Sequence, residues 1–374
     1  MPGPHTAFAD ATLHAADLQR FTAHLLLRIQ KQIAGLENDL RFAARGFDLG
    51  SIDNGRVRNV QAARFARRAR EMTDLRMARI SEILHTELHA LAEYEITYSS
   101  GLIKRTLEGL EKVPAVKVPP GIRKAIVKQS TSQISLGNAG IANLDSWVKQ
   151  TTGSLKTKMA RQIAASTRLR EPGSLLAQRL TGTGNIRGIS LTTRNELRAL
   201  TRTAVTSASS ITRSAVMRRN RRAVMGVQQV SILDGRTSNI CLAYSGKKWR
   251  RTPKGFMRAV GHRLPYLSGT PRHYGCRSYE IPWFRSAHGM RAGKKGDAGA
   301  FTGEPPPPPS LSQLLRDRGP AYQNDLLGPG RGALYRAGRI DVDHLIDFSG
   351  QPRNLTTIRR LARRRELARI KRGG

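Results

Sequence analysis

Residues 227–241 read VQQVSILDGRTSNIC, and the pattern of the chain changes at this stretch. VQQVSILD alternates apolar and polar side chains and contains β-branched residues, which is typical of a strand. The Asp-Gly pair that ends it predicts a turn. KKWRR at 247–251 and RSYEIPWF at 277–284 are further strand candidates. The sequence therefore predicts a small antiparallel sheet between residues 227 and 284.

The chain before this sheet carries helical patterns. Apolar side chains recur every three or four residues from Leu18 to Leu40, so they form one face of a long helix. Residues 60–110 continue the pattern and are long enough for two helices or for one bent helix. The prolines in VPAVKVPPGI interrupt it, because proline removes a backbone donor and disfavours helix at the preceding residue. Further helix is predicted to about residue 180.

A helix with two different faces is predicted just before the sheet, within residues 191–226. Thr193 and Glu196 fit a capping box at its start. One side of the helical wheel is apolar and carries Leu197, Leu200, Ala204, Ala208, Ile211 and Ala215. The other side is basic, and its candidate DNA contacts are Arg194, Arg198, Arg202 and Arg213. A solvated arginine face is the alternative for this helix.

The net charge narrows the class of partner. The chain has 374 residues, with 64 Lys and Arg against 27 Asp and Glu, which gives a formal net charge of +37. Such a surplus favours a polyanion, most often a nucleic-acid backbone, because binding releases condensed counterions. An anionic membrane surface is a second candidate, and a solvated basic surface is the plain alternative. No apolar segment predicts a membrane span, and the N-terminal residues lack the features of a signal peptide.

The composition changes again after the predicted sheet. Residues 287–310 are a Gly- and Pro-rich linker that includes a polyproline run. Residues 311–374 predict a short helical tail whose last helix is basic, and Arg363, Arg364 and Arg365 are candidate DNA contacts there. The expected fold is therefore α+β and mostly helical: long N-terminal helices, a helix with a small antiparallel sheet, a linker and a basic tail.

Four side chains around the predicted sheet are candidate metal ligands: Asp234, Cys241, His273 and Cys276. Zinc prefers thiolate, imidazole and carboxylate ligands, and a closed set of four is typical of a structural ion. Two alternatives stay open. One is a Cys241–Cys276 disulfide, which a reducing compartment disfavours, and the other is a hydrogen-bonded core in which Asp234 pairs with Arg236 or Arg277. A nucleophilic Cys–His pair is a weaker interpretation, because nothing in the sequence supplies an oxyanion hole or a substrate pocket.

These residues also carry a resemblance to a known family. The helix RTAVTSASSITRSAVMRRN, the strand followed by DGRTSNIC, and the block GTPRHYGCRS resemble the Mu F-like head morphogenesis (minor head protein) family of tailed bacteriophages. The resemblance covers about residues 190–284. Beside the four candidate ligands, the matching positions are Gly235, Arg236, Thr237, Ser238, Pro271, Arg277 and Ser278. The insert RRTPKGFMRAVGHRLPYLS departs from the family, which often has a short Gly-Pro loop there.

The resemblance implies a minor head protein that is made in the host bacterial cytoplasm and incorporated in the virion head near the portal vertex. Its expected partners are the portal protein, the scaffold or major capsid protein, and non-specific double-stranded DNA. Residues 1–185 would contact portal or scaffold, and residues 186–286 would form the head morphogenesis core. No catalytic residue and no small-molecule substrate are expected, and one structural zinc is the candidate cofactor. The alternative functions are a metal-dependent nuclease or toxin, and a free non-specific DNA-binding protein.

Overall fold

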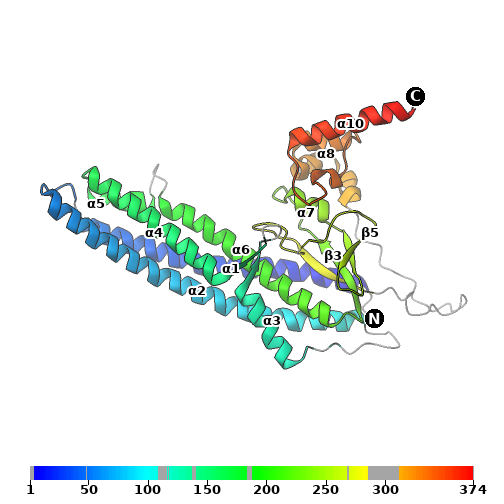
Figure 1. The fold of residues 1–374 in the computed structure, drawn as a ribbon, viewed down its shortest axis with the longest axis horizontal. Coiled ribbons are helices and arrows are strands. Elements are labelled where there is room, and N and C mark those ends of the chain that lie inside the picture. Colours follow the sequence, from blue (N-terminus) through cyan, green and yellow to red (C-terminus); the bar gives the residue numbers. More distant parts are fainter. Residues whose placement is uncertain are drawn as a thin grey trace, which may run out of the picture.

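The computed structural model describes residues 4–47, 49–107, 116, 118–136, 140–182, 188–267, 269–284 and 311–373. Within these residues the chain is mostly helical and contains two small antiparallel sheets, so the predicted α+β class is confirmed. The predicted linker, residues 287–310, lies outside the described residues. Figure 1 shows a long helical bundle with the larger sheet at one end and the tail helices stacked over that end.

Five helices run along the bundle: α1 (Pro4–Arg45), α2 (Gly55–Leu107), α4 (Leu144–Arg168), α5 (Gly173–Thr181) and α6 (Ile189–Arg219). The helical pattern before the prolines forms one helix, since α2 alone has 53 residues. Apolar side chains from α1, α2, α4 and α6 form a common core, as their three- and four-residue spacing predicts.

The interruptions of the bundle have local causes. The Asn54 side chain accepts hydrogen bonds from the backbone N–H groups of Arg56 and Val57, at 2.9 and 3.3 Å, and so caps the start of α2. Proline occupies the first position of α3 (Pro120–Ser132), where a missing N–H costs nothing. A short hairpin of β1 (Gln133–Ser135) and β2 (Ile141–Asn143) then leads into α4.

Helix α6 belongs to two cores. Its first half packs in the bundle through residues such as Leu200 and Ala204. Its last turns, with Val216 and Met217, pack in a second core under the larger sheet. The domain boundary expected between residues 185 and 186 therefore separates segments that pack in the same hydrophobic core, that of the bundle.

The predicted capping box at the start of α6 is wrong. The helix begins at Ile189 with Gly188 as its N-cap, so Thr193 lies inside the first turns. The Thr193 side chain is buried, and its hydroxyl donates to the carbonyl of Ile189 at 3.3 Å. A threonine bonded back into its own helix cannot cap that helix.

The larger sheet has the strand order β5-β4-β3-β6, and its neighbouring strands are antiparallel. The strands are β3 (Val224–Val230), β4 (Lys248–Arg251), β5 (Met257–Val260) and β6 (Tyr279–Phe284). The antiparallel sheet and three of its strands were predicted, whereas β5 was not. Its four residues, MRAV, place an apolar side chain on each face, so they lack the apolar–polar alternation of a half-buried strand.

The tail packs on this sheet region around the short helix α7 (Asn239–Tyr244), and Lys247 also forms an ion pair with Asp343 of the tail. Leu242 of α7 is fully buried in a core that otherwise comes from the tail. The tail elements are α8 (Leu311–Leu327), α9 (Pro329–Arg336), the 3-10 helix η3 (Val342–Leu345) and α10 (Leu355–Gly373). Helix α7 thus connects the sheet to the tail.

A buried carboxylate joins three helices of the bundle. Glu95 of α2 is 0% exposed, and its Oε1 accepts from His14 Nε2 at 2.8 Å and from the Ser209 hydroxyl at 2.6 Å. Arg213 of α6 places its Nε 3.5 Å from the other carboxylate oxygen. Burial alone would raise the pKa of Glu95, but Arg213, His14 and Ser209 together lower it below the ordinary value of 4.5.

Because the folded-state pKa of Glu95 is lowered, its contribution to stability is present above pH 4.5 and is lost as the pH falls below that value. We expect Glu95→Gln to reduce stability at neutral pH and to flatten the loss of stability between about pH 5 and pH 3. Thermal denaturation as a function of pH measures both effects. Glu71→Gln, an exposed change on the same helix, is the control, and identical pH profiles for the two variants would contradict this expectation.

Candidate metal centre

The two sequence segments that carry the candidate ligands meet at one place in the fold. Ser238 is the N-cap of α7, and its hydroxyl accepts from the backbone N–H of Cys241 at 3.2 Å. This cap holds Cys241 in the first turn of α7. On the other segment, Gly275 has a φ of 72°, a left-handed conformation that glycine adopts without strain. The resulting turn lets the Cys276 N–H donate to the His273 carbonyl at 3.1 Å.

Three of the four predicted ligands are brought together. Cys241 Sγ lies 3.1 Å from His273 Nε2 and 3.5 Å from Cys276 Sγ, and the three donor atoms all lie within 4.8 Å of one another. Both cysteines are buried, with 3% of Cys241 and 1% of Cys276 exposed. This group of two thiols and one imidazole could hold a metal ion.

Neighbouring groups orient the imidazole and polarise the thiols. His273 Nδ1 donates to the Tyr274 carbonyl at 2.9 Å, which leaves Nε2 as an acceptor 2.7 Å from the Ser238 hydroxyl and beside the two sulfur atoms. The pKa of Cys276 is lowered because the Cys241 thiol donates a hydrogen bond to it, although burial acts in the opposite direction. The same hydrogen bond and the burial raise the pKa of Cys241. Cys276 is therefore the more acidic of the two thiols.

The donor spacing fits a tetrahedral ion with little movement. Tetrahedral zinc with ordinary bond lengths places two sulfur ligands about 3.8 Å apart, and a sulfur and a nitrogen ligand about 3.5 Å apart. The observed separations, 3.5 and 3.1 Å, are shorter by a few tenths of an ångström. Both cysteines are free, and their sulfur atoms are farther apart than the ~2.05 Å of a disulfide bond.

Asp234, the fourth predicted ligand, has a different partner. Arg277 donates to both carboxylate oxygens, with Nη1 2.7 Å from Oδ2. The backbone N–H of Arg236 donates to Oδ1 at 3.0 Å. These hydrogen bonds, with that of Arg277 the largest cause, hold the pKa of Asp234 well below its usual range. Asp234 thus closes the turn through the Arg277 pair that the hydrogen-bond alternative proposed.

The remaining residues of the motif connect the turn to the sheet. Thr237 Oγ1 donates to the carbonyl of Ile232 at 2.5 Å and accepts from the backbone N–H of Asp234 at 3.0 Å. Ser278 donates to the hydroxyl of Ser231 at 2.9 Å, and Ser231 donates to the Cys241 carbonyl at 2.8 Å. These bonds fix the position of Cys241 relative to β3.

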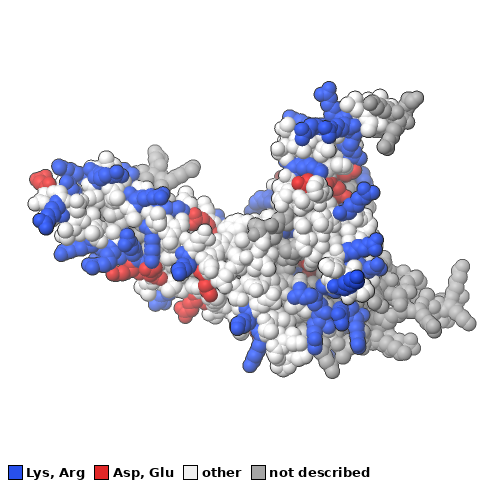
Figure 2. Space-filling model, viewed as in Figure 1, with Lys and Arg blue, Asp and Glu red and all other residues white. Residues whose placement is uncertain are grey.

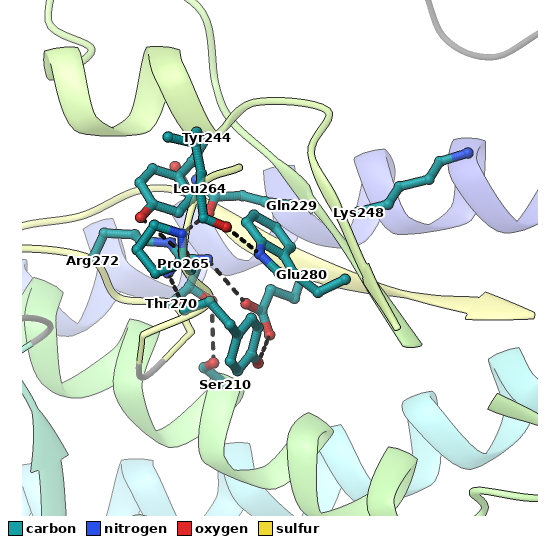
Figure 3. A network of polar contacts seen from close by, with 12 residues as sticks. Ser210, Gln229, Tyr244, Lys248, Leu264, Pro265, Thr270, Arg272 and Glu280 are labelled. Atoms are coloured by element: carbon teal, nitrogen blue, oxygen red, sulfur yellow. Dashed lines mark hydrogen bonds and ion pairs between the residues drawn. The ribbon is translucent and has the colours of Figure 1, made fainter. Parts of the chain in front are cut away.

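Arg272, between Pro271 and His273, was missed by sequence reasoning. Its side chain is among the most deeply buried in the described chain and is 1% exposed. Figure 3 shows its guanidinium group among side chains that come from α7, the sheet and the loop before β6. The guanidinium carbon lies 4.1 Å from the ring centre of Tyr244, 5.2 Å from that of Trp249 and 5.6 Å from that of Tyr266.

Polar groups complete this arginine site. Arg272 Nε donates to Gln229 Oε1 at 2.7 Å, and Nη2 lies 3.7 Å from the buried carboxylate of Glu280. Tyr266 donates to the other oxygen of Glu280 at 2.8 Å. Since Arg272 directly precedes His273, these contacts anchor the segment that carries His273 and Cys276. The only sequence signal was its place in the motif, because burial of an arginine cannot be read from its residue type.

The predicted basic face of α6 is shorter than expected. Arg198 and Arg202 are exposed, and Arg194 forms an ion pair with Glu37 of α1. Arg213 is 5% exposed and bound to Glu95, so its prediction as a DNA contact is wrong. A helix packed on both sides has no fully solvated face in its second half.

Arg202 and its neighbours form a cationic cluster beside the candidate metal centre. Partial desolvation is the first cause that lowers the pKa of Arg202, and the nearby charges of Arg198, Arg236 and Arg277 lower it further. Of these neighbours, Arg236 is exposed and Arg277 is half-buried. The cluster therefore offers exposed positive charge at the motif turn.

The predicted basic residues of the tail lie on its surface. Arg363, Arg364 and Arg365 of α10 are exposed. Arg365 Nη1 also lies 2.8 Å from His344 Nε2. Figure 2 shows further groups of Lys and Arg on the bundle and over the sheet. Within the described residues, no helix is long and apolar enough to cross a membrane, as expected.

Comparison with protein-family models found no match to this chain. Searches of curated proteins and of solved structures likewise found no match.

Proposed function

We propose that this chain is a minor head protein of a tailed bacteriophage, of the Mu F-like head morphogenesis type. It would bind the portal protein and double-stranded DNA during procapsid assembly, genome packaging or delivery. The observation that supports this most is the convergence of the two segments that carry the resemblance. Cys241 lies within hydrogen-bond distance of both His273 and Cys276, although these residues follow it by 32 and 35 positions in the sequence.

The proposed cofactor is one structural zinc ion. Cys241, His273 and Cys276 would hold it, and when bound it would fix α7 to the loop before β6. A soft thiolate and imidazole donor set favours zinc over magnesium or calcium. Asp234 is engaged by Arg277, so the fourth position would fall to another group or to water.

A structural role fits these residues better than an enzymatic one. A nucleophilic cysteine has to be reached by its substrate, yet Cys276 is 1% exposed. A metal nuclease would need its open coordination position to be reached by a polynucleotide, whereas both cysteines that would hold the ion are buried, and it would need further acidic or imidazole ligands nearby. The nearest carboxylate of the motif, Asp234, is instead bound to arginine. We therefore propose a non-enzymatic protein.

The helical bundle would provide the contacts to portal, scaffold or major capsid protein. Phe42 and Leu27 on α1 are 77% and 65% exposed, and Leu75 on α2 is 59% exposed. Apolar side chains that remain exposed on long helices are suited to packing against helices of a partner. The exposed arginines of α6 and α10 would lie toward DNA.

Sedimentation with phage heads tests this function. We expect antibody against this chain to detect it in head fractions of a lysate separated on a density gradient, together with the portal subunit. A nuclease, toxin or free DNA-binding protein would remain in the soluble fractions. Recovery only in those fractions would contradict the proposed function.

A further inference from the structure

The β4–β5 hairpin, residues 248–260, is unusually basic. It carries Lys248, Arg250, Arg251, Lys254 and Arg258, and the sequence contains no Asp or Glu between Asp234 and Glu280. None of the five cations forms an ion pair within the described part of the chain. The positive charge of the hairpin is therefore not paired with any carboxylate in the described part of the chain.

Strand register concentrates this charge on one face. Arg250 of β4 lies directly opposite Arg258 of β5, and both side chains are exposed. Like charges directly opposite each other destabilise a strand pair, and an anion between them removes that penalty. In contrast, the adjacent pair of Trp249 and Ala259 faces the core under the sheet.

A buried side chain and turn hydrogen bonds fix the hairpin backbone that carries these cations. Trp249 is fully buried, and its ring nitrogen donates to the Leu264 carbonyl at 3.0 Å. The backbone N–H of Thr252 donates to the Phe256 carbonyl at 2.8 Å, and the N–H of Phe256 donates to the Thr252 hydroxyl at 3.1 Å. Phe256, at the tip, is 71% exposed.

The basic surface continues beyond the hairpin onto the end of α6. The pKa of Arg218 is lowered by burial first and by the charge of Arg251 second, so these two arginines are neighbours. Arg219, the last residue of α6, is exposed, as are Arg221 and Arg222 in the connection to β3. Figure 2 shows a dense group of Lys and Arg over the part of the molecule that holds β3 and β5 in Figure 1.

We propose that the β4–β5 hairpin is the principal contact of this protein with the phosphate backbone of double-stranded DNA. This inference rests on the proposed function and makes the hairpin, with the adjoining end of α6, the main DNA contact, to which the exposed arginines earlier in α6 and those of α10 would add. A two-stranded ribbon fits the major groove, and opposed arginines on one face can neutralise phosphates beside it. An exposed aromatic tip can pack against sugars or bases. A membrane is less suited, because Phe256 is the only large apolar side chain of the hairpin that is mostly exposed.

Binding of a fluorescent 30-base-pair duplex across a salt series tests this contact. The hairpin variant Arg250→Gln, Lys254→Gln, Arg258→Gln removes three exposed charges. The matched control Arg64→Gln, Arg67→Gln, Arg68→Gln removes three exposed charges from α2. We expect the hairpin variant to bind on the order of 100-fold more weakly at about 0.1 M salt, and its salt slope to fall by about 0.9 for each phosphate that it no longer neutralises. Thermal denaturation confirms that both variants are folded.

The possible outcomes separate this inference from the function on which it rests. Weak binding and a flatter slope in the hairpin variant alone would support the contact. Equally weakened binding in both variants, or unchanged binding in both, would overturn it and leave DNA binding by the wild-type chain intact. A hairpin variant that loses only its binding to phosphatidylserine vesicles would overturn it in favour of a membrane. If the wild-type chain binds no DNA, the DNA role in the proposed function fails as well.

Discussion

Replacing Arg272 by alanine should lower the free energy of unfolding by about 3–5 kcal/mol, the usual cost of removing one partner from a buried ion pair. The variant would leave the Glu280 carboxylate buried beside an empty space. It would also remove the guanidinium group that Tyr244, Trp249 and Tyr266 surround. Because Arg272 anchors the segment that carries His273, the candidate metal centre should loosen at the same time.

Urea denaturation of Arg272→Ala measures this effect, and Arg263→Ala is the matched control. Arg263 lies in the preceding loop and is exposed, so its replacement should change stability by no more than about 0.5 kcal/mol. A double variant, Arg272→Met with Glu280→Gln, removes both charges and should recover part of the stability. A cost below about 1 kcal/mol for Arg272→Ala would mean that the aromatic residues hold the loop without it.

Cys276→Ser should abolish metal binding by the purified protein and lower its melting temperature. A structural ion stabilises the folded state by mass action, about 2.7 kcal/mol when free zinc is about 100 times its Kd. A serine hydroxyl is a poor replacement for a thiolate ligand. Because Cys276 is buried and is not part of the β4–β5 hairpin, the affinity for DNA should change much less than the melting temperature.

Elemental analysis and thermal denaturation, with and without chelator, provide the measurements. The wild-type protein should contain about one zinc per chain and should melt at a lower temperature after chelation. Chelator should not change the melting temperature of Cys276→Ser, so this variant controls for effects of chelator that do not come from the candidate metal centre. Equal melting temperatures for both proteins in all four conditions would rule out a structural metal at this site.

Much of the fold could be predicted because local patterns determine it. The apolar spacing from Leu18 to Leu40 and the alternation in VQQVSILD indicated the long helix and the central strand correctly. Short-range motif spacing also brought His273 and Cys276 to the same site as Cys241. In each case the residues themselves carry the information, through periodicity or through the chemistry of their side chains.

The errors concern residues whose role depends on distant partners. Arg213 has the spacing of a surface arginine, but Glu95, 118 positions earlier in the sequence, holds it inside the bundle. Asp234 has the chemistry of a ligand, but Arg277 occupies its carboxylate. Arg272 is buried because several elements converge on it, and no single segment shows that convergence. Such pairings are set by tertiary structure, which propensity and spacing do not encode.

The most direct test of the proposed function is quantitative mass spectrometry of gradient-purified phage particles from a host that carries this gene. Full heads and heads that have ejected their DNA should be measured side by side, with the portal subunit as the internal standard. We predict a low copy number, comparable to that of the portal subunit, in full heads. Absence of the chain from both full and emptied heads would contradict a role in the virion.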